Sequence, residues 1–178
     1  MAKHSHPLPL DRHFFITALA ESVSLDFADT GRPFGFVSGR AVTTTCRVGA
    51  IRRALSNLIE NAVSDGELAN VSIEADATTV RIVVEDDGPG IDTAEIDRVF
   101  EPFVRIEASR SREAGGAGLG LAIARSVARS HGGEIVLETP NDGGLRAILY
   151  LPRVASQYLL WLLISTPSAI LPVRHHIE

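Results

Sequence analysis

Apolar and polar residues alternate along the chain with two different periods, and the helical period governs three stretches. Residues 11–29, 47–64 and 119–131 each carry apolar side chains at intervals of three and four positions. That spacing places the apolar side chains on one face of a helix, where they can pack against a core. The pattern therefore predicts three amphipathic helices.

Five further stretches have the short β-branched runs or the two-residue alternation of a β-strand. Neighbouring stretches are separated by turn residues in two places, and each of these pairs is predicted to form a hairpin. Residues 43–45, Thr-Thr-Thr, fit either a connection or a strand end and receive no assignment. The predicted strands are residues 34–37, 71–76, 80–86, 134–139 and 145–151.

The two ends of the chain differ in composition from the single domain predicted between them, residues 11–152. Residues 1–10 are polar, do not have the apolar core of a signal peptide, and are expected to form a disordered leader. Residues 153–178 form an apolar extension in which positions 154–173 carry no charge. Prolines and polar residues interrupt this run, so we expect it to dock on the domain or on a second copy rather than span a bilayer.

The 178 residues carry a formal net charge of −5, with 45% hydrophobic and 22% charged positions, as expected of a globular domain. An acidic chain does not offer the basic face that nucleic acid requires, so no nucleic-acid partner is expected. Cys46 is the single cysteine, which excludes an intrachain disulfide framework and a cysteine-rich metal site.

The strongest chemical signal lies in residues 83–91, where a β-branched run ends in Asp86 and a second aspartate. Gly88 and Gly90 follow directly, and Pro89 stiffens the turn between them. A strand that delivers a carboxylate beside bare backbone suits a flat polar ligand. An ordinary turn is the alternative, because Asp-Gly and Pro-Gly pairs are common turn signals.

Two asparagines, Asn57 and Asn61, lie four positions apart in the second predicted helix and therefore share one face of it. Asparagine is a mediocre helix former, so two of them within one helix call for an explanation. A solvated face or a cap near the helix end is one explanation. The other is chemical, because the amide oxygen is a hard, neutral ligand that suits Mg²⁺.

Residues 92–116 form a long polar connection without apolar periodicity. A loop of that length in a compact domain is usually functional, and this one has the character of a lid. Glycines at positions 116, 118 and 120 then open the third predicted helix and leave its first amides unpaired, which favours an anion site. A flexible hinge before a core helix is the alternative.

Four motifs follow one another along the chain: residues 57–62 (Asn-Leu-Ile-Glu-Asn-Ala), 86–91 (Asp-Asp-Gly-Pro-Gly-Ile), 100–103 (Phe-Glu-Pro-Phe) and 116–121 (Gly-Ala-Gly-Leu-Gly-Leu). They resemble the asparagine, first glycine, phenylalanine and second glycine boxes in the catalytic and ATP-binding domain of sensor histidine kinases. The wider family includes gyrase, Hsp-type chaperones and mismatch-repair ATPases. The likeness implies an α/β two-layer sandwich of the Bergerat type, with a mixed, mainly antiparallel sheet, helices on one face and ATP beneath a lid.

The resemblance also implies a role for each matching residue. Asp86 would accept a hydrogen bond from the adenine amino group, which selects adenine over guanine. Asn61 would ligate Mg²⁺, and Asn57 would assist at the phosphates, so both are expected to be catalytic. The other positions implied to contact ATP are Gly88, Gly90, Ile91, Phe103, Arg105, Gly116, Gly118, Leu119 and Gly120.

Two departures from the family pattern bear on activity. Family members often have a basic and an aromatic residue three and four positions after the second asparagine, where this chain has Ser64 and Asp65. Sensor kinases phosphorylate a histidine that precedes a glutamate on a dimerisation helix, and none of the six histidines here precedes a glutamate. The sequence therefore shows the ATP side of a kinase and not the acceptor side.

The leading hypothesis is the ATP-binding catalytic domain of a two-component sensor histidine kinase. It would bind ATP or ADP with Mg²⁺, phosphorylate a separate histidine-bearing dimerisation domain, and so serve a response regulator. The domain would be cytoplasmic and joined to a membrane only through parts outside this chain, and residues 153–178 could mediate self-association. One alternative is a gyrase- or chaperone-type ATPase, in which a glutamate base would occupy the position of Asn57. Another is a non-catalytic nucleotide sensor or partner-switching module, favoured by Ser64 and Asp65.

Overall fold

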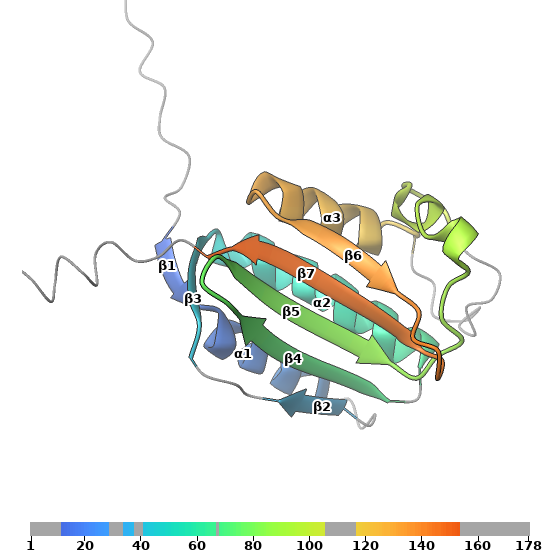
Figure 1. Ribbon diagram of the computed structural model, residues 1–178, viewed down its shortest axis with the longest axis horizontal. Helices are drawn as coiled ribbons and strands as arrows, with labels where there is room; N and C mark the ends of the chain where they lie inside the picture. Colours follow the sequence, from blue (N-terminus) through green and yellow to red (C-terminus); the bar gives the residue numbers. More distant parts are fainter. Residues whose placement is uncertain (1–11, 29–33, 38–40, 67, 106–116, 154–178) are drawn as a thin grey trace, which may run out of the picture.

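The computed structural model describes residues 12–28, 34–37, 41–66, 68–105 and 117–153. These residues form two layers, a sheet and a layer of helices that lies behind it in Figure 1. The predicted leader and residues 154–178 of the apolar extension lie outside these ranges. Within them, no helix combines the length and apolar character needed to cross a membrane.

The main sheet has five strands in the order β2-β4-β5-β7-β6 (Figure 1). β2 runs parallel to β4, whereas the other neighbouring strands are antiparallel. The predicted mixed, mainly antiparallel sheet is therefore confirmed. The strands are β2 (Phe34–Val37), β4 (Ala69–Ala75), β5 (Thr79–Asp86), β6 (Glu134–Glu138) and β7 (Leu145–Pro152).

Three helices cover one face of this sheet: α1 (Ile16–Ala28), α2 (Val48–Asp65) and α3 (Gly120–Ser130) (Figure 1). The two-residue period of β5 turns Val80, Ile82 and Val84 toward them, and each is at most 1% exposed. A helix that packs on this face of the sheet needs an apolar stripe, and α2 has one from Ile51 to Ala62. The core therefore lies between the sheet and the helices.

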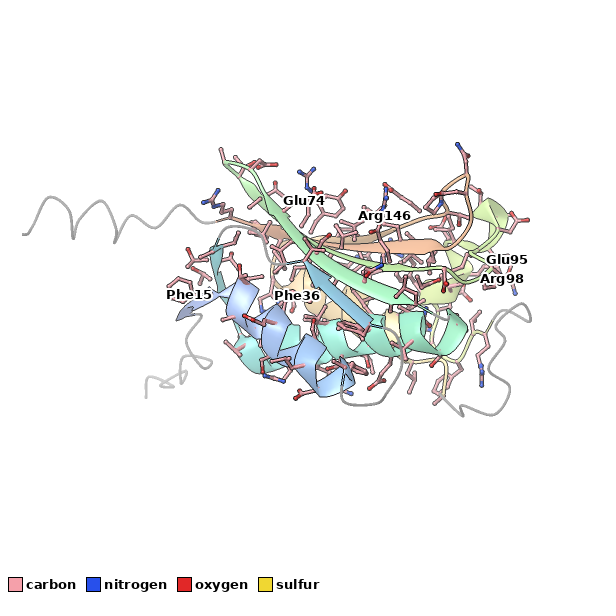
Figure 2. All side chains as sticks on the ribbon, turned by 90° about the horizontal axis from the view of Figure 1, so that it is seen from below. Phe15, Phe36, Glu74, Glu95, Arg98 and Arg146 are labelled. Carbon is pink, nitrogen blue, oxygen red and sulfur yellow. The ribbon has the colours of Figure 1, made fainter. Side chains whose placement is uncertain are left out.

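The opposite face of the sheet carries charged side chains. Figure 2 shows Glu74 and Arg146 on this side, away from the helices. Arg146 Nε lies 2.6 Å from Glu85 Oε1, and Arg81 lies 3.2 Å from Glu74 Oε2. Cross-strand pairs of opposite charge suit a sheet face that stays in contact with water, which explains why helices cover only the other face.

The prediction of a helix over residues 11–29 was wrong in its first turn. Residues Arg12–Phe15 form β1, which pairs antiparallel with β3 (Thr43–Cys46), and α1 begins only at Ile16. The backbone N–H of Ile16 donates to Val42 O at 2.8 Å and fixes this junction. The partner strand lies about thirty positions further along the chain, so local periodicity could not show that these residues pair in a strand.

The other helices and strands that the sequence predicted begin and end within two residues of their predicted bounds. α2 packs against both α3 and β5. The carboxyl end of β5, the second half of α2 and the beginning of α3 consequently lie at the same end of the molecule.

We expect Leu149→Ala to lower the free energy of unfolding by about 2–5 kcal/mol, because Leu149 is 0% exposed and truncation leaves a cavity. Urea denaturation followed by circular dichroism measures the change. Val136→Ala, on the neighbouring strand and 38% exposed, is the matched control and should change stability much less. Equal effects of the two substitutions would contradict the burial described above.

Candidate nucleotide-binding site

A cavity of about 500 Å³ opens where the end of β5, α2 and the beginning of α3 come together. Its fourth wall is the segment that contains two short 3₁₀-helices, η1 (Thr93–Glu95) and η2 (Arg98–Phe100). The volume lies within the usual range for small-molecule sites. The lining residues are Asn57, Glu60, Asn61, Ser64, Asp65, Asp86, Pro89, Gly90, Ile91, Val99, Val104, Arg105, Ala117, Gly118, Leu119, Gly120, Leu121, Ile123 and Leu145.

Most of the residues predicted for the site meet in this cavity, although they come from three separate parts of the chain. The asparagine box contributes Asn57 and Asn61, and the first glycine box contributes Asp86, Gly90 and Ile91. The remaining predicted residues in the lining are Arg105, Gly118, Leu119 and Gly120. The tertiary structure therefore assembles one site from motifs that are up to sixty positions apart.

Three predicted residues have a different place. Gly116 lies outside the described residues. Gly88 does not line the cavity, but its N–H donates to Asp86 Oδ1 at 2.8 Å and so orients that carboxylate. Phe103 is 74% exposed and is not among the lining residues. Its backbone contributes instead, because its N–H donates to Gly118 O at 3.0 Å.

Asp86 is the last residue of β5, and its carboxylate is partly buried in the cavity. Burial raises the pKa of Asp86 to about 6, although the N–H groups of Gly88 and Leu145 act to lower it; the neighbouring carboxylates of Asp65 and Asp87 raise it further. A half-buried carboxylate that is ionised at neutral pH is a strong acceptor for a ligand amino group.

The first glycine box is held against the turn between β6 and β7. Gly90 has a φ of +71°, and a Cβ there would lie 2.6 Å from Thr139 Cγ2 and 2.7 Å from Gly144 O. Thr139 Oγ1 donates to Ile91 O at 2.8 Å and accepts from Ile91 N at 3.2 Å. Only glycine fits this position, so the backbone at the cavity floor is both bare and fixed.

Asn57 presents an unusual group on the α2 wall. Its side-chain nitrogen is buried and has no hydrogen-bond partner among the described residues. Such a donor is costly unless a ligand satisfies it. Gly120 lies directly opposite, since a Cβ there would be 3.7 Å from Asn57 Cβ. A buried donor beside the first residue of α3 fits an anionic ligand, such as a phosphate.

The beginning of α3 offers backbone amides to the same space. Leu119 is its N-cap residue and makes no side-chain capping hydrogen bond. Gly118 has a φ of +66°, and a Cβ there would lie 2.9 Å from Val104 O. The chain can therefore pass close to the η2 segment only with glycine at this position, and the uncapped amides remain available to an anion.

The oxygen ligands in the cavity also fit one hard metal ion whose coordination shell is completed mainly by the bound molecule. Among the described residues, no group of three His, Cys, Asp or Glu side chains could hold a metal. The amide of Asn61 is a suitable oxygen ligand for Mg²⁺, which commonly takes one or two protein ligands and completes its shell with phosphate and water oxygens.

Sequence reasoning missed several lining residues, mainly apolar ones. Val99 and Val104 flank the phenylalanine box, and Leu145 pairs with Asp86 in the sheet register. Nothing in the local pattern distinguishes these side chains from ordinary core residues, since the register that brings Leu145 to Asp86 is a tertiary property. The other missed positions are Glu60, Pro89, Ala117, Leu121 and Ile123.

Comparison with known proteins places the chain in a family. The family model described as "Histidine kinase-, DNA gyrase B-, and HSP90-like ATPase" matches residues 47–155, which include both asparagines, Asp86 and the start of α3. The chain belongs to this family. Its site and fold thus define an ATP-binding domain.

Individual relatives identify the branch of the family. The chain is 43% identical over 105 residues to the sensor histidine kinase GtrS of Pseudomonas aeruginosa, covering 59% of this chain and 21% of that protein. Among solved structures, the ATP binding domain of PrrB from Mycobacterium tuberculosis superimposes with a TM-score of 0.68 at 28% identity, covering 81% of this chain and 98% of that one. Full-length ShkA in complex with AMPPNP superimposes with a TM-score of 0.68 at 26% identity, covering 84% of this chain and 33% of that one. This chain therefore has the ATP-binding catalytic domain of sensor histidine kinases.

We expect Asp86→Asn to weaken ADP binding by about 1–3 kcal/mol, because an amide can present a donor where the ligand amino group needs an acceptor. Isothermal titration calorimetry measures the loss. Asp87→Asn is the matched control, since it removes the same charge from an exposed residue outside the cavity lining and should leave affinity nearly unchanged. Undiminished affinity in Asp86→Asn would contradict the role of the carboxylate.

ADP affinity should also fall as the pH drops through about 6, where the raised pKa of Asp86 lies. The sign follows because the ionised carboxylate is the better acceptor, and a carboxyl that is protonated in the free protein must first lose its proton. The limit is about tenfold per pH unit below the pKa. Titrations from pH 8 to 5 test this, with Asp86→Asn as the reference for the nucleotide's own phosphate ionisation. Parallel curves for the two proteins would contradict it.

Proposed function

We propose that this chain is the nucleotide-binding catalytic part of a two-component sensor histidine kinase. It would bind Mg-ATP and transfer the γ-phosphoryl group to a histidine on a separate dimerisation domain. The observation that carries the proposal is the cavity in which Asp86, the asparagine face of α2 and the uncapped start of α3 meet. The carboxylate of Asp86 suits an adenine, and the amides at the start of α3 suit a polyphosphate.

The chain's own residues have distinct tasks in this proposal. Asp86 accepts a hydrogen bond from the adenine amino group, while the bare backbone around Gly90 lets the flat base approach. The amides at the start of α3 and the side-chain nitrogen of Asn57 donate to phosphate oxygens. Asn61 would hold Mg²⁺, which neutralises phosphate charge when bound. These groups bind and orient the nucleotide, which is the protein's main task in phosphoryl transfer.

The transfer itself needs an acceptor supplied by another domain. An imidazole nitrogen forms a bond to the γ-phosphorus while the bond from that phosphorus to the ADP oxygen breaks, with the two groups roughly in line. The ionised ADP leaves, and the imidazole proton passes to a base near the acceptor histidine. Asn57 occupies the place of the glutamate base found in gyrase-type relatives, and an amide cannot accept a proton from water. Transfer to an imidazole therefore fits the site better than ATP hydrolysis.

Partners and location follow from the same proposal. ShkA was solved with AMPPNP bound, which supports ATP and ADP as ligands of this related domain. The phosphorylated dimerisation domain would then pass its phosphoryl group to a response regulator. We place the domain on the cytoplasmic side, where ATP is available. Association through residues 153–178 remains a separate prediction, because most of that extension lies outside the described residues.

One observation favours a second candidate, a nucleotide sensor without transfer activity. Ser64 and Asp65 line the cavity where family members often have a basic and an aromatic residue. Asp65 also raises the pKa of Asp86 through charge repulsion, after the larger effect of burial. A nucleotide sensor of this kind would bind adenine without the usual aromatic contact and would lack the phosphate contact that a basic residue gives.

We expect the chain to bind Mg-ATP without labelling itself, and to label an added dimerisation domain of a sensor kinase with acid-labile phosphate. Incubation with γ-labelled ATP, followed by gel electrophoresis and acid treatment, measures this. Asn61→Ala should remove labelling, whereas Asp87→Asn should retain it. Binding without transfer to any dimerisation domain would support the sensor, and stable phosphohistidine on the isolated chain would contradict the division of roles.

A further inference from the structure

The η2 wall of the cavity has little structure of its own to hold it. η2 is three residues long, and a 3₁₀-helix of this length is not stable alone. Its Val99 is buried at 7% exposure and lines the cavity, whereas Arg98, the first residue of η2, and Glu101, which follows η2, are exposed. Tertiary contacts must therefore hold η2 against the domain.

Arg125 of α3 makes such a contact. Its guanidinium carbon lies 4.3 Å from the centre of the Phe100 ring, the distance of a cation–π interaction. Phe100 is the last residue of η2 and directly follows Val99 in the cavity wall. Arg125 itself does not line the cavity, so it acts on a ligand indirectly, through the segments that do.

The guanidinium of Arg125 is in turn held by Glu134, the first residue of β6. Arg125 Nε donates to Glu134 Oε1 at 2.9 Å, and the backbone N–H of Ile135 donates to the same oxygen at 2.9 Å. Arg129 donates to the other oxygen, also at 2.9 Å. A carboxylate with three donors has one preferred orientation, so Arg125 is presented to Phe100 in a fixed position.

We propose that Arg125 is a positioning residue that fixes η2 on α3 and thereby sets the wall of the nucleotide cavity. The contact joins two parts of the cavity wall, because α3 and η2 pack against each other and both contribute lining residues. A second contact is the hydrogen bond from Phe103 N to Gly118 O at 3.0 Å, which joins the residues after η2 to the residues just before α3. With both links in place, Val99 and Val104 hold a defined position before a nucleotide arrives.

The order of η2 can be measured without any ligand. Asp97 is exposed, immediately precedes η2 and makes no side-chain capping hydrogen bond, so Asp97→Cys can carry a nitroxide label. Cys46 is 1% exposed and should stay unlabelled in the folded protein. In this background we compare Arg125→Met, which keeps the length of the side chain without its charge, with Arg129→Met. The latter removes a Glu134 partner but leaves the Phe100 contact.

Arg125→Met should increase label mobility in the ligand-free protein and weaken ADP binding about fivefold, the loss expected of one cation–π contact. Arg125→Lys, which keeps a cation over the ring, should restore part of both effects. Arg129→Met should leave both close to the unsubstituted background. Thermal unfolding of each variant, followed by circular dichroism, separates a change at η2 from general destabilisation.

Unchanged label mobility in Arg125→Met would overturn the proposal, and so would raised mobility with unchanged ADP affinity. An equal effect of Arg129→Met would overturn it as well, because the order would then come from Glu134 alone. The effect on affinity rests on the proposed function, whereas label mobility does not. If the unsubstituted protein binds no ADP, the proposed function fails, and the mobility of Arg125→Met against Arg125→Lys still decides whether Arg125 positions η2.

Discussion

The pairing of β5 with β4 on one side and β7 on the other is the interaction on which the site depends. Both ladders continue to Asp86, where Ala69 and Leu145 are its neighbours in register. Strand alternation then leaves no choice of face: with Val80, Ile82 and Val84 in the core, Asp86 must point to the helix side. A one-residue shift in the register of β5 would bury Glu85 and turn the carboxylate of Asp86 out to solvent.

That placement has an energetic cost which the ligand can offset. Burial raises the pKa of Asp86 to about 6, so the ionised carboxylate is less stable in the folded protein than in water. The buried side-chain nitrogen of Asn57 has no partner among the described residues and carries a similar penalty. The acceptor of Asp86 and the donor of Asn57 line the same cavity, and a single molecule that combines an amino-bearing base with phosphates satisfies both.

The remaining walls are shaped by close backbone contact. Gly90 and Gly118 have positive φ angles, and the space that a Cβ would need is occupied by the β6–β7 turn in one case and by the η2 segment in the other. Glycine therefore serves two purposes here, since it allows the turn and lets one segment lie directly against another. The segments that form these walls have little secondary structure of their own, and contacts with α3 and the sheet hold them in place.

The sequence by itself determined the periodic helices, the strands of the main sheet and the motifs that meet at the cavity, because these depend on side-chain spacing and on short runs of residues. Asn57, Asn61, Asp86, Gly118 and Gly120 were singled out from the sequence, and they line one cavity. The tertiary structure decided what depends on distant partners. It turned residues Arg12–Phe15 into a strand by pairing them with Thr43–Cys46, and it brought Leu145 and Val99 to the site. It also left the Phe103 side chain exposed, while the backbone N–H of Phe103 donates to Gly118 O. Local periodicity encodes neither a strand's pairing partner nor a residue's neighbours in a cavity wall, so these features depend on the tertiary structure.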